Sequence, residues 1–366
     1  MSDDLAPAEK YALAKSRSKH PHLSAFRNRL SFDLDSFQIA ACEVLEEGRS
    51  VLVAAPTGAG KTIVAEFAVY LSQVTDSGKT FYTTPMKALS NQKYNELVAE
   101  YGSENVGLLT GDTSINPSAR IVIMTTEVLR NMLYAGSSAI NDLHFVILDE
   151  VHFLADKFRG PVWEEVILHL PPSVNLVSLS ATVSNAEEFG DWLQAVRGST
   201  DVIVSEDRPV PLYQHVYSGG NLSDLFEEGG EWANPPRINH DVIRLGHSQS
   251  RRHGGHHNRD RRGGPVDIVW TLYNEGLLPG IFFIFSRVGC DRAVDDMLYA
   301  GAELTTPEER DEIRRVIEER TAHLHSEDLA SLGFAEWEEA LLCGVAAHHA
   351  GLLPAFKEVV EELFQK

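Results

Sequence analysis

The chain has 366 residues, of which 43% are hydrophobic and 23% charged, and its formal net charge is −21. At about 150 residues per domain, this length suggests two globular domains. No apolar run approaches the roughly 18 residues of a membrane-spanning helix. The first residues lack the apolar stretch of a secretory signal, and three widely spaced cysteines make neither a disulfide framework nor a zinc site. We therefore expect a soluble, cytoplasmic protein without a membrane partner.

The excess of acidic residues argues against nucleic-acid binding driven by the net charge of the protein, because contacts to phosphates need cationic side chains nearby. The charge is nevertheless uneven. Residues 1–30 hold six basic and three acidic residues, five arginines lie within 251–262, and residues 301–366 hold fifteen acidic and six basic residues. A basic cleft would still bind nucleic acid, so composition leaves this question open.

Residues 1–30 are predicted to be a basic, loosely helical lead-in. From 31 to 205, apolar strands alternate with helical stretches, which is typical of an α/β domain with a parallel sheet covered on both faces. Ligands bind such sheets at the carboxyl ends of the strands. The clearest predicted strands are Val51–Ala55, Thr80–Thr84, Ile121–Thr125, Phe145–Asp149 and Leu176–Ser180.

Residues 206–265 are predicted to be a linker with a disordered insert rich in Arg, His and Gly, since this composition cannot bury enough apolar surface to fold. A second α/β unit is expected over 266–366. Its only strand candidates are Ile281–Phe285 and Gly344–His348, against about five or six strands in an average sheet. The second unit is therefore expected to be incomplete.

A phosphate-binding loop is predicted directly after the first strand and before an amphipathic helix. Glycines let successive backbone N–H groups converge on phosphate oxygens, a lysine reaches the β- and γ-phosphates, and a hydroxyl binds Mg²⁺. Alanine stands where the common pattern begins with glycine, and the alternative interpretation is an ordinary glycine-rich turn. The residues are Ala55, Pro56, Thr57, Gly58, Ala59, Gly60, Lys61 and Thr62.

Two carboxylates follow the apolar strand that ends near residue 149. We expect Asp149 to hold Mg²⁺ together with Thr62, and Glu150 to polarise the water that attacks the γ-phosphate. Together with Lys61, these carboxylates are the predicted catalytic residues. Alone, an apolar strand ending in Asp-Glu is weak evidence, but its pairing with the phosphate loop makes ATP hydrolysis with Mg²⁺ the favoured chemistry.

Several further segments occur in an order that resembles the superfamily-two helicases of the DEVH-box class. The resemblance is to the Ski-like, exosome-associated RNA helicases and, most strongly, to the actinobacterial HelY type. It implies tandem RecA-like domains, of which the second is truncated here. The segments that carry it are Phe37-Gln38, Thr84–Gln92, Leu109–Asp112, Thr125–Arg130, Asp149–His152, Ser180–Thr182, Phe285–Arg287 and His348–Pro354.

The resemblance also implies roles for individual residues. Gln38 would present its amide to adenine and Phe32 would stack on the base, although a helix-surface Gln beside a core Phe is the simpler alternative. His152, Ser180 and Thr182 would couple the ATP site to the strand, with helix capping as the alternative for the two hydroxyls. Sequence-independent contacts to sugar and phosphate are expected from Pro85, Lys87, Asn91, Gln92, Gly111, Asp112, Thr126 and Arg130.

Members of this family continue beyond the last residue of this chain with the motif that supplies an arginine finger. Losing that arginine typically costs about 10³–10⁵ in rate. The expected function is thus an ATP-dependent helicase that translocates on single-stranded RNA or DNA, here competent to bind but with weak turnover. The alternative is a non-catalytic module that binds ATP and nucleic acid, and RNA-degradation machinery is a further expected partner.

Overall fold

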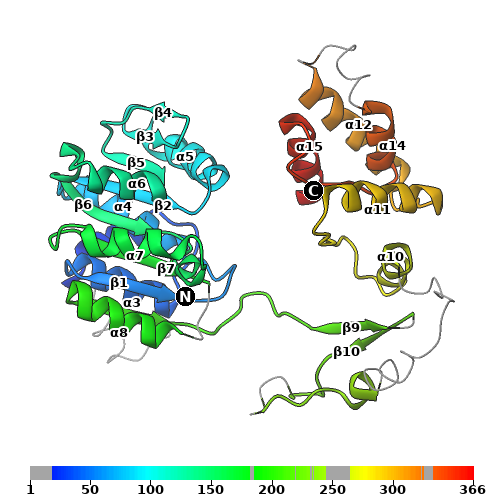
Figure 1. Ribbon diagram of the computed structural model, residues 1–366, viewed down its shortest axis with the longest axis horizontal. Helices are drawn as coiled ribbons and strands as arrows, with labels where there is room; N and C mark the ends of the chain where they lie inside the picture. Colours follow the sequence, from blue (N-terminus) through cyan, green and yellow to red (C-terminus); the bar gives the residue numbers. More distant parts are fainter. Residues whose placement is uncertain are drawn as a thin grey trace. The chain divides into compact units, whose positions relative to one another are not determined.

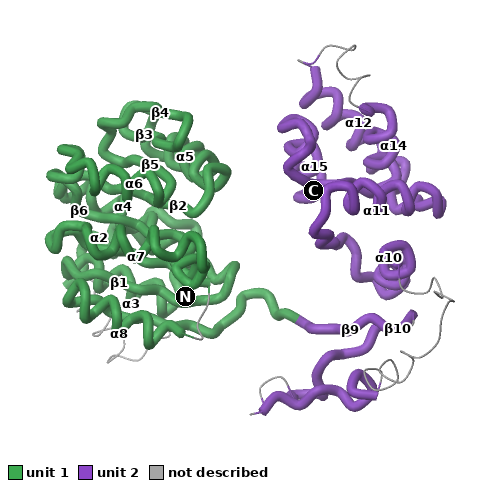
Figure 2. The backbone as a smooth tube through the Cα atoms, viewed as in Figure 1, with its two compact units in different colours: residues 1–212 green, residues 213–366 purple. Residues whose placement is uncertain are grey.

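The computed structural model describes residues 19–181, 185–218, 220–230, 233, 235–244, 264–322, 324 and 333–366. The chain divides into two units, residues 1–212 and 213–366 (Figure 2). Within these described ranges, no helix combines the length and the hydropathy that crossing a membrane requires. Thr182, one of the expected coupling residues, and the Arg-rich insert lie outside the described residues.

Unit 1 is built on an eight-stranded sheet with the order β4-β3-β5-β2-β6-β7-β1-β8 (Figure 1). All neighbouring pairs are parallel except β3 and β4. The strands are β1 (Ser50–Ala54), β2 (Lys79–Thr84), β3 (Val106–Leu109), β4 (Ser114–Ile115), β5 (Ile121–Thr125), β6 (Leu143–Leu148), β7 (Asn175–Ser180) and β8 (Thr200–Val204). This confirms the five predicted strands to within two residues, and it confirms the α/β class.

Both faces of the sheet are buried, because successive side chains of a strand point to opposite faces. In β1, Val51 and Val53 join one apolar core while Leu52 joins the other. One face is covered by α2 (Pro21–Arg27), α3 (Ser36–Glu46), α4 (Thr62–Val74) and α5 (Lys87–Tyr101). The other is covered by α6 (Thr126–Tyr134), α7 (Gly160–His169) and α8 (Ala186–Arg197), with the short helices η1 (Ser138–Ile140) and η2 (Val151–Ala155) in the connections.

Unit 2 contains no parallel sheet among its described residues. A hairpin of β9 (His215–Ser218) and β10 (Asn221–Asp224) occupies part of the predicted linker. A small apolar core forms around Ile317, Leu341 and Val359. Its helices include α10 (Pro265–Asn274), α11 (Arg287–Tyr299), α12 (Pro307–Thr321), α14 (Phe334–Leu342) and α15 (Pro354–Gln365).

The prediction of strands at Ile281–Phe285 and Gly344–His348 was wrong. Neither segment pairs with a strand in the part of the chain that the structure describes. Phe283 is 78% exposed and Phe285 fully exposed, so the first segment keeps its apolar composition without a sheet to bury it. A strand is stabilised by its neighbours rather than by its own residues.

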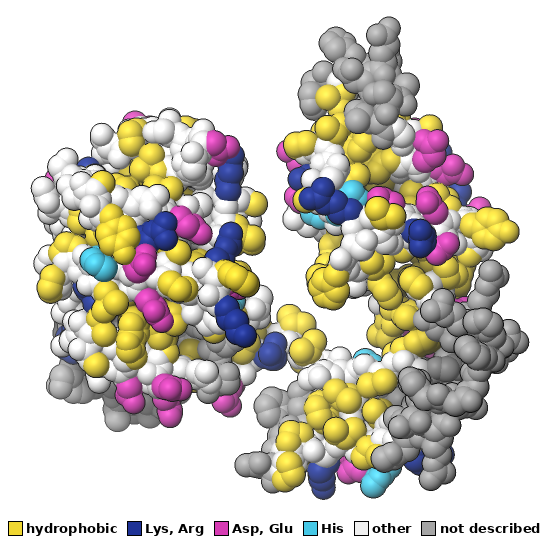
Figure 3. Space-filling model, in the orientation of Figure 1, with side chains coloured by type: hydrophobic (Ala, Val, Ile, Leu, Met, Phe, Trp, Pro, Cys, Tyr) yellow, Lys and Arg dark blue, Asp and Glu magenta, His cyan; other side chains and the backbone are white. Residues whose placement is uncertain are grey.

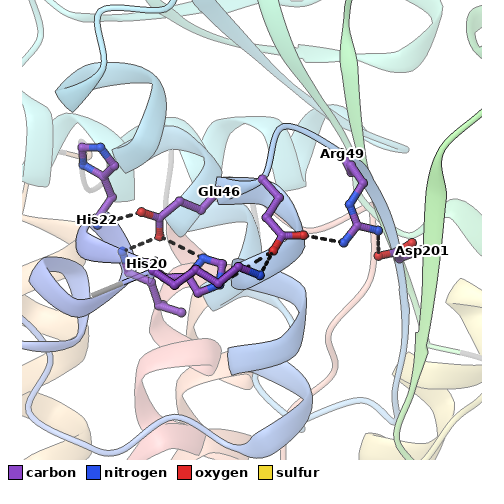
Figure 4. A network of polar contacts seen from close by, with 8 residues as sticks. His20, His22, Glu46, Arg49 and Asp201 are labelled. Carbon is purple, nitrogen blue, oxygen red and sulfur yellow. Dashed lines mark hydrogen bonds and ion pairs between the residues drawn. The ribbon is translucent and has the colours of Figure 1, made fainter. Parts of the chain in front are cut away.

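A polar network fastens the first described residues to the sheet (Figure 4). Glu46 at the end of α3 accepts hydrogen bonds from the backbone N–H groups of His22 and Leu23, both at 2.9 Å, and so caps the start of α2. The neighbouring Glu47 pairs with Arg49, which in turn pairs with Asp201 in β8. Helix α2 is therefore an integral part of unit 1.

We predict that Glu46→Ala lowers the free energy of unfolding of unit 1 by about 1–2 kcal/mol, because two partly buried N–H groups at the start of α2 lose their acceptor. Chemical denaturation measures this change. The matched control is Glu47→Ala, which removes the surface ion pairs with Lys19 and Arg49 and a 3.8 Å contact with His20 but leaves both N–H groups capped, and so should cost less. Equal losses in the two variants would show that capping is not what Glu46 contributes.

Candidate nucleotide and nucleic-acid site

The predicted phosphate loop joins the carboxyl end of β1 to the first residue of α4, Thr62. Gly58 and Gly60 have φ of +84° and +77°, a region that residues with a Cβ rarely adopt. A Cβ on Gly60 would also lie 2.7 Å from Nε2 of Gln38. Ala55, where the common pattern has glycine, is fully buried, and its N–H donates to the carbonyl of Ser180 at 3.1 Å. The loop accommodates this alanine.

The side chain of Lys61 is hydrogen-bonded to the backbone of its own phosphate loop. Its Nζ donates to the carbonyl oxygens of Ala55 at 2.7 Å and Pro56 at 2.9 Å. Burial lowers the pKa of Lys61, and the negative charges of Glu150 and Asp149 oppose that shift. The ammonium group is thus held by neutral carbonyls within the electrostatic reach of both predicted catalytic carboxylates.

Gln38, at the start of α3, is buried and bound at both ends of its amide. Its Oε1 accepts from the N–H of Asp35 at 2.8 Å, and its Nε2 donates to the carbonyls of Gly60 at 3.0 Å and Ala59 at 3.4 Å. The amide expected to face adenine therefore contacts the phosphate loop in this structure. Phe32, the expected stacking residue, is 56% exposed.

Asp149 follows β6 and is held by two hydrogen bonds. Its Oδ2 accepts from the hydroxyl of Tyr82 at 2.9 Å, and its Oδ1 accepts from the N–H of Glu150 at 2.9 Å. Burial raises the pKa of Asp149, and both hydrogen bonds oppose that shift. Tyr82 was not among the residues predicted from the sequence, although the hydroxyl of a tyrosine in a buried strand needs a hydrogen-bond partner.

Glu150 occupies the left-handed region with φ of +54°, which is uncommon for a residue other than glycine. Its Oε2 lies 3.2 Å from Nδ1 of His152, and both atoms are buried without a hydrogen bond. Burial raises the pKa of Glu150, and the neighbouring Asp149 raises it further. The carboxylate thus faces the expected coupling residue His152, while Ser180, at the end of β7, is buried beside the phosphate loop.

The expected nucleic-acid contacts follow the carboxyl ends of β2, β3 and β5, three adjacent strands. Lys87 pairs with Asp112 at 2.5 Å, which joins the segments after β2 and β3. Asn91 and Gln92 are exposed on α5, and the side chain of Arg130 on α6 lies 3.8 Å from Glu165. Figure 3 shows Lys and Arg side chains along the side of unit 1 at which the strands end.

Three residues near this edge differ from what the sequence predicts or add to it. Thr126 is fully buried, and its hydroxyl donates to the carbonyl of Thr84 at 3.4 Å, so its side chain is turned into the domain. Arg159, which the sequence analysis did not single out, donates from Nη1 to the carbonyl of Pro85 at 3.0 Å. Gly111 has open space where a Cβ would stand, so no close backbone contact within unit 1 requires glycine there.

Comparison with known proteins agrees with this architecture. Residues 35–189 match the family model described as DEAD/DEAH box helicase. This range contains the phosphate loop, the Asp149-Glu150 pair and the predicted strand-binding edge. Residues 35–189 are therefore a RecA-like helicase domain of the DEAD/DEAH box family.

Several relatives of the chain are named as helicases. The chain is 55% identical to "Probable helicase HelY" of Mycobacterium tuberculosis (strain ATCC 25618 / H37Rv), covering 93% of this chain and 39% of that protein. It is 40% identical to "Superkiller complex protein 2" of Homo sapiens, covering 92% and 28%, and 36% identical to "Antiviral helicase SKI2" of Saccharomyces cerevisiae, covering 92% and 30%. The chain thus spans about two fifths of the length of the HelY proteins.

Proposed function

We propose that this chain binds and hydrolyses ATP with Mg²⁺ and couples the hydrolysis to movement along single-stranded RNA or DNA and to strand separation. The observation that carries the proposal is the arrangement at one sheet edge. The glycine-dependent loop around Lys61 and the partly buried pair Asp149 and Glu150 lie at the same edge of the sheet as three strand ends that present polar and basic residues.

The residues fit ATP and Mg²⁺. The positive φ of Gly58 and Gly60 supports a loop whose N–H groups face phosphate oxygens, at the start of a 13-residue helix. Burial makes the charges of Asp149 and Glu150 costly, and a cation between them and the phosphates would stabilise both. Thr62 and Asp149 would hold Mg²⁺, which, when bound, neutralises phosphate charge.

Each residue then has a separable task. Lys61 would exchange the carbonyls of Ala55 and Pro56 for phosphate oxygens. Glu150 would accept a hydrogen bond from the attacking water and orient it, and His152 would limit the positions that this carboxylate can take. Phe32 and Gln38 would contact the adenine base. Ser180 and Thr182 would transmit the state of this site to the strand.

The bound strand would lie across the ends of β2, β3 and β5. Lys87, Arg130, Asn91 and Gln92 would contact sugar and phosphate, and the segment around Gly111 would allow close approach. Such contacts hold the backbone of the strand and do not distinguish its bases. We therefore propose sequence-independent binding, with a complex for RNA degradation as a protein partner.

The test is ATP hydrolysis by the purified chain, with and without single-stranded RNA or DNA of mixed sequence, beside its Lys61→Ala variant. We expect a rate that depends on Lys61 and rises with single strands. Comparison of the RNA and DNA arms identifies the preferred strand. Nucleotide and strand binding without any Lys61-dependent hydrolysis would overturn the proposal in favour of a non-catalytic module.

A further inference from the structure

We propose that Tyr82 is a positioning residue for Asp149, and that contacts through Lys93 and Glu96 connect it to the strand-binding residue Gln92. This connection would couple nucleotide and strand binding by a path through β2 and α5, separate from Ser180 and Thr182. The inference rests on the proposed function, because it assumes that Asp149 serves the nucleotide and Gln92 serves the strand.

The first contact of the path fixes the orientation of Asp149. Tyr82 lies on the central strand β2 and is fully buried, and its hydroxyl donates to Oδ2 of Asp149 at 2.9 Å. The other oxygen, Oδ1, is bound by the N–H of Glu150. Without the Tyr82 hydroxyl, one oxygen of a largely buried carboxylate would lose its donor and the carboxylate would be free to rotate.

The second contact lies on the face of the Tyr82 ring. Nζ of Lys93 is 5.7 Å from the ring centroid, within the range of cation–π attraction. The Lys93 side chain is only 13% exposed, and its ammonium is also paired with Oε2 of Glu96. Lys93 is therefore held between the aromatic ring on β2 and a carboxylate on its own helix.

The third contact reaches the strand-binding face of α5. The side-chain amide of Gln92 donates from Nε2 to Oε1 of Glu96 at 2.9 Å. Gln92 and Glu96 are both exposed, whereas Tyr82 is buried, so the path runs from the surface to Asp149, the carboxylate proposed to hold Mg²⁺.

Competition for the Gln92 amide supplies the physical basis for coupling. If a sugar or phosphate oxygen takes that amide, Glu96 loses one of its two donors and is free to turn, and Lys93, which is already paired with it, would move with it relative to the Tyr82 ring. The two arrangements of Lys93 place the ring and its hydroxyl differently against Asp149. Because coupling between two binding equilibria is reciprocal, nucleotide bound with Mg²⁺ would change strand affinity by the same factor.

The experiment measures that factor directly. Anisotropy of a fluorescent single strand gives its affinity with and without a non-hydrolysable ATP analogue and Mg²⁺, and the ratio of the two affinities is the coupling factor. In the absence of nucleotide, we expect Tyr82→Phe to bind the strand with an affinity within about twofold of the wild-type affinity. We expect its coupling factor to be about fivefold or more below that of the wild type. The Mg²⁺ concentration needed for half-maximal binding of a fluorescent ADP should rise several-fold.

Lys93→Met, which keeps the length of the side chain and removes its charge, tests the middle of the path. Its effect and that of Tyr82→Phe should be less than additive in the double variant, because both interrupt one chain of contacts. Tyr70→Phe is the matched control. Tyr70 on α4 packs against Phe67 of the same helix and Phe26 of α2, so its loss of a hydroxyl should leave the coupling factor unchanged. Thermal melting verifies that each variant is folded.

The outcomes separate the two proposals. If the wild-type chain shows no strand binding that responds to nucleotide, the proposed function fails and this inference fails with it. If the wild-type chain shows coupling and folded Tyr82→Phe and Lys93→Met keep the same factor, the path through β2 and α5 is refuted while the proposed function stands.

Discussion

Replacing Lys61 with alanine is expected to abolish strand-stimulated ATP hydrolysis and to weaken ATP binding by about 10- to 150-fold. A hydrogen bond to a charged group is worth about 1.5–3 kcal/mol, and each 1.4 kcal/mol is a factor of ten in affinity. The ammonium already lies within the loop, 2.7 Å from the carbonyl of Ala55, so the protein holds the charge in place before nucleotide arrives. Titration of a fluorescent ATP analogue and a phosphate-release assay measure the two effects.

Lys79→Ala is the control for Lys61→Ala. Lys79 begins β2 and so lies at the opposite, amino end of the parallel strands, where nucleotide affinity should not depend on it. If Lys61→Ala binds ATP as tightly as Lys79→Ala does, the phosphate site has been assigned to the wrong loop.

The second large effect is expected from Glu150→Gln. This change keeps the shape of the side chain but removes the acceptor strength with which a carboxylate orients water. Hydrolysis should fall by about 10²–10⁴, the usual contribution of such a group, whereas ATP affinity should be retained. Single-turnover hydrolysis and equilibrium binding, measured on the same preparation, separate these two quantities.

The same variant has a predicted effect on stability that depends on pH. Burial raises the pKa of Glu150 in the folded chain above its ordinary value of 4.5, so the folded state binds this proton more tightly than the unfolded state. Wild-type stability should then fall as the pH rises from about 4.5 through the folded pKa, and this loss should be absent in Glu150→Gln. Glu150→Gln should thus have a higher free energy of unfolding than the wild type at pH values above the folded pKa of Glu150, and the difference should vanish below about pH 4.5.

Glu164→Gln provides the matched comparison, because Glu164 is an exposed glutamate on α7. Denaturation at several pH values should show no difference between this control and the wild type. A Glu150→Gln variant that hydrolyses ATP at the wild-type rate would remove Glu150 from the proposed chemistry, whatever its stability.

The sequence predicted the sheet of unit 1 well for a physical reason. Strands β1, β5 and β6 are buried on both faces, so their composition is almost continuously apolar and a polar residue or a proline follows close to the end of each. This pattern placed Asp149 at the end of β6 and the phosphate loop at the end of β1. Since parallel strands end at one edge, the sequence also predicted that these residues share a site.

The features that the sequence did not predict depend on distant partners. The apolar segment Ile281–Phe285 has the composition of a buried strand, but composition cannot supply the neighbouring strands that would pair with it. Tyr82 is 67 residues from Asp149 in sequence, and only the pairing of β2 with β6 brings its hydroxyl to that carboxylate. The contact of Gln38 with the phosphate loop likewise arises from the packing of α3 beside α4.

The position of Gln38 bears on how the site distinguishes nucleotides. Both ends of its amide are bound, to Asp35 on one side and to the carbonyls of Ala59 and Gly60 on the other. For the NH2 group of this amide to donate to adenine, it must release at least one of its two hydrogen bonds to the phosphate loop. A base that does not hydrogen-bond to the amide would leave the bonds between Gln38 and the phosphate loop intact. We therefore expect ATP and GTP to differ in their effect on the mobility of the loop as well as in affinity.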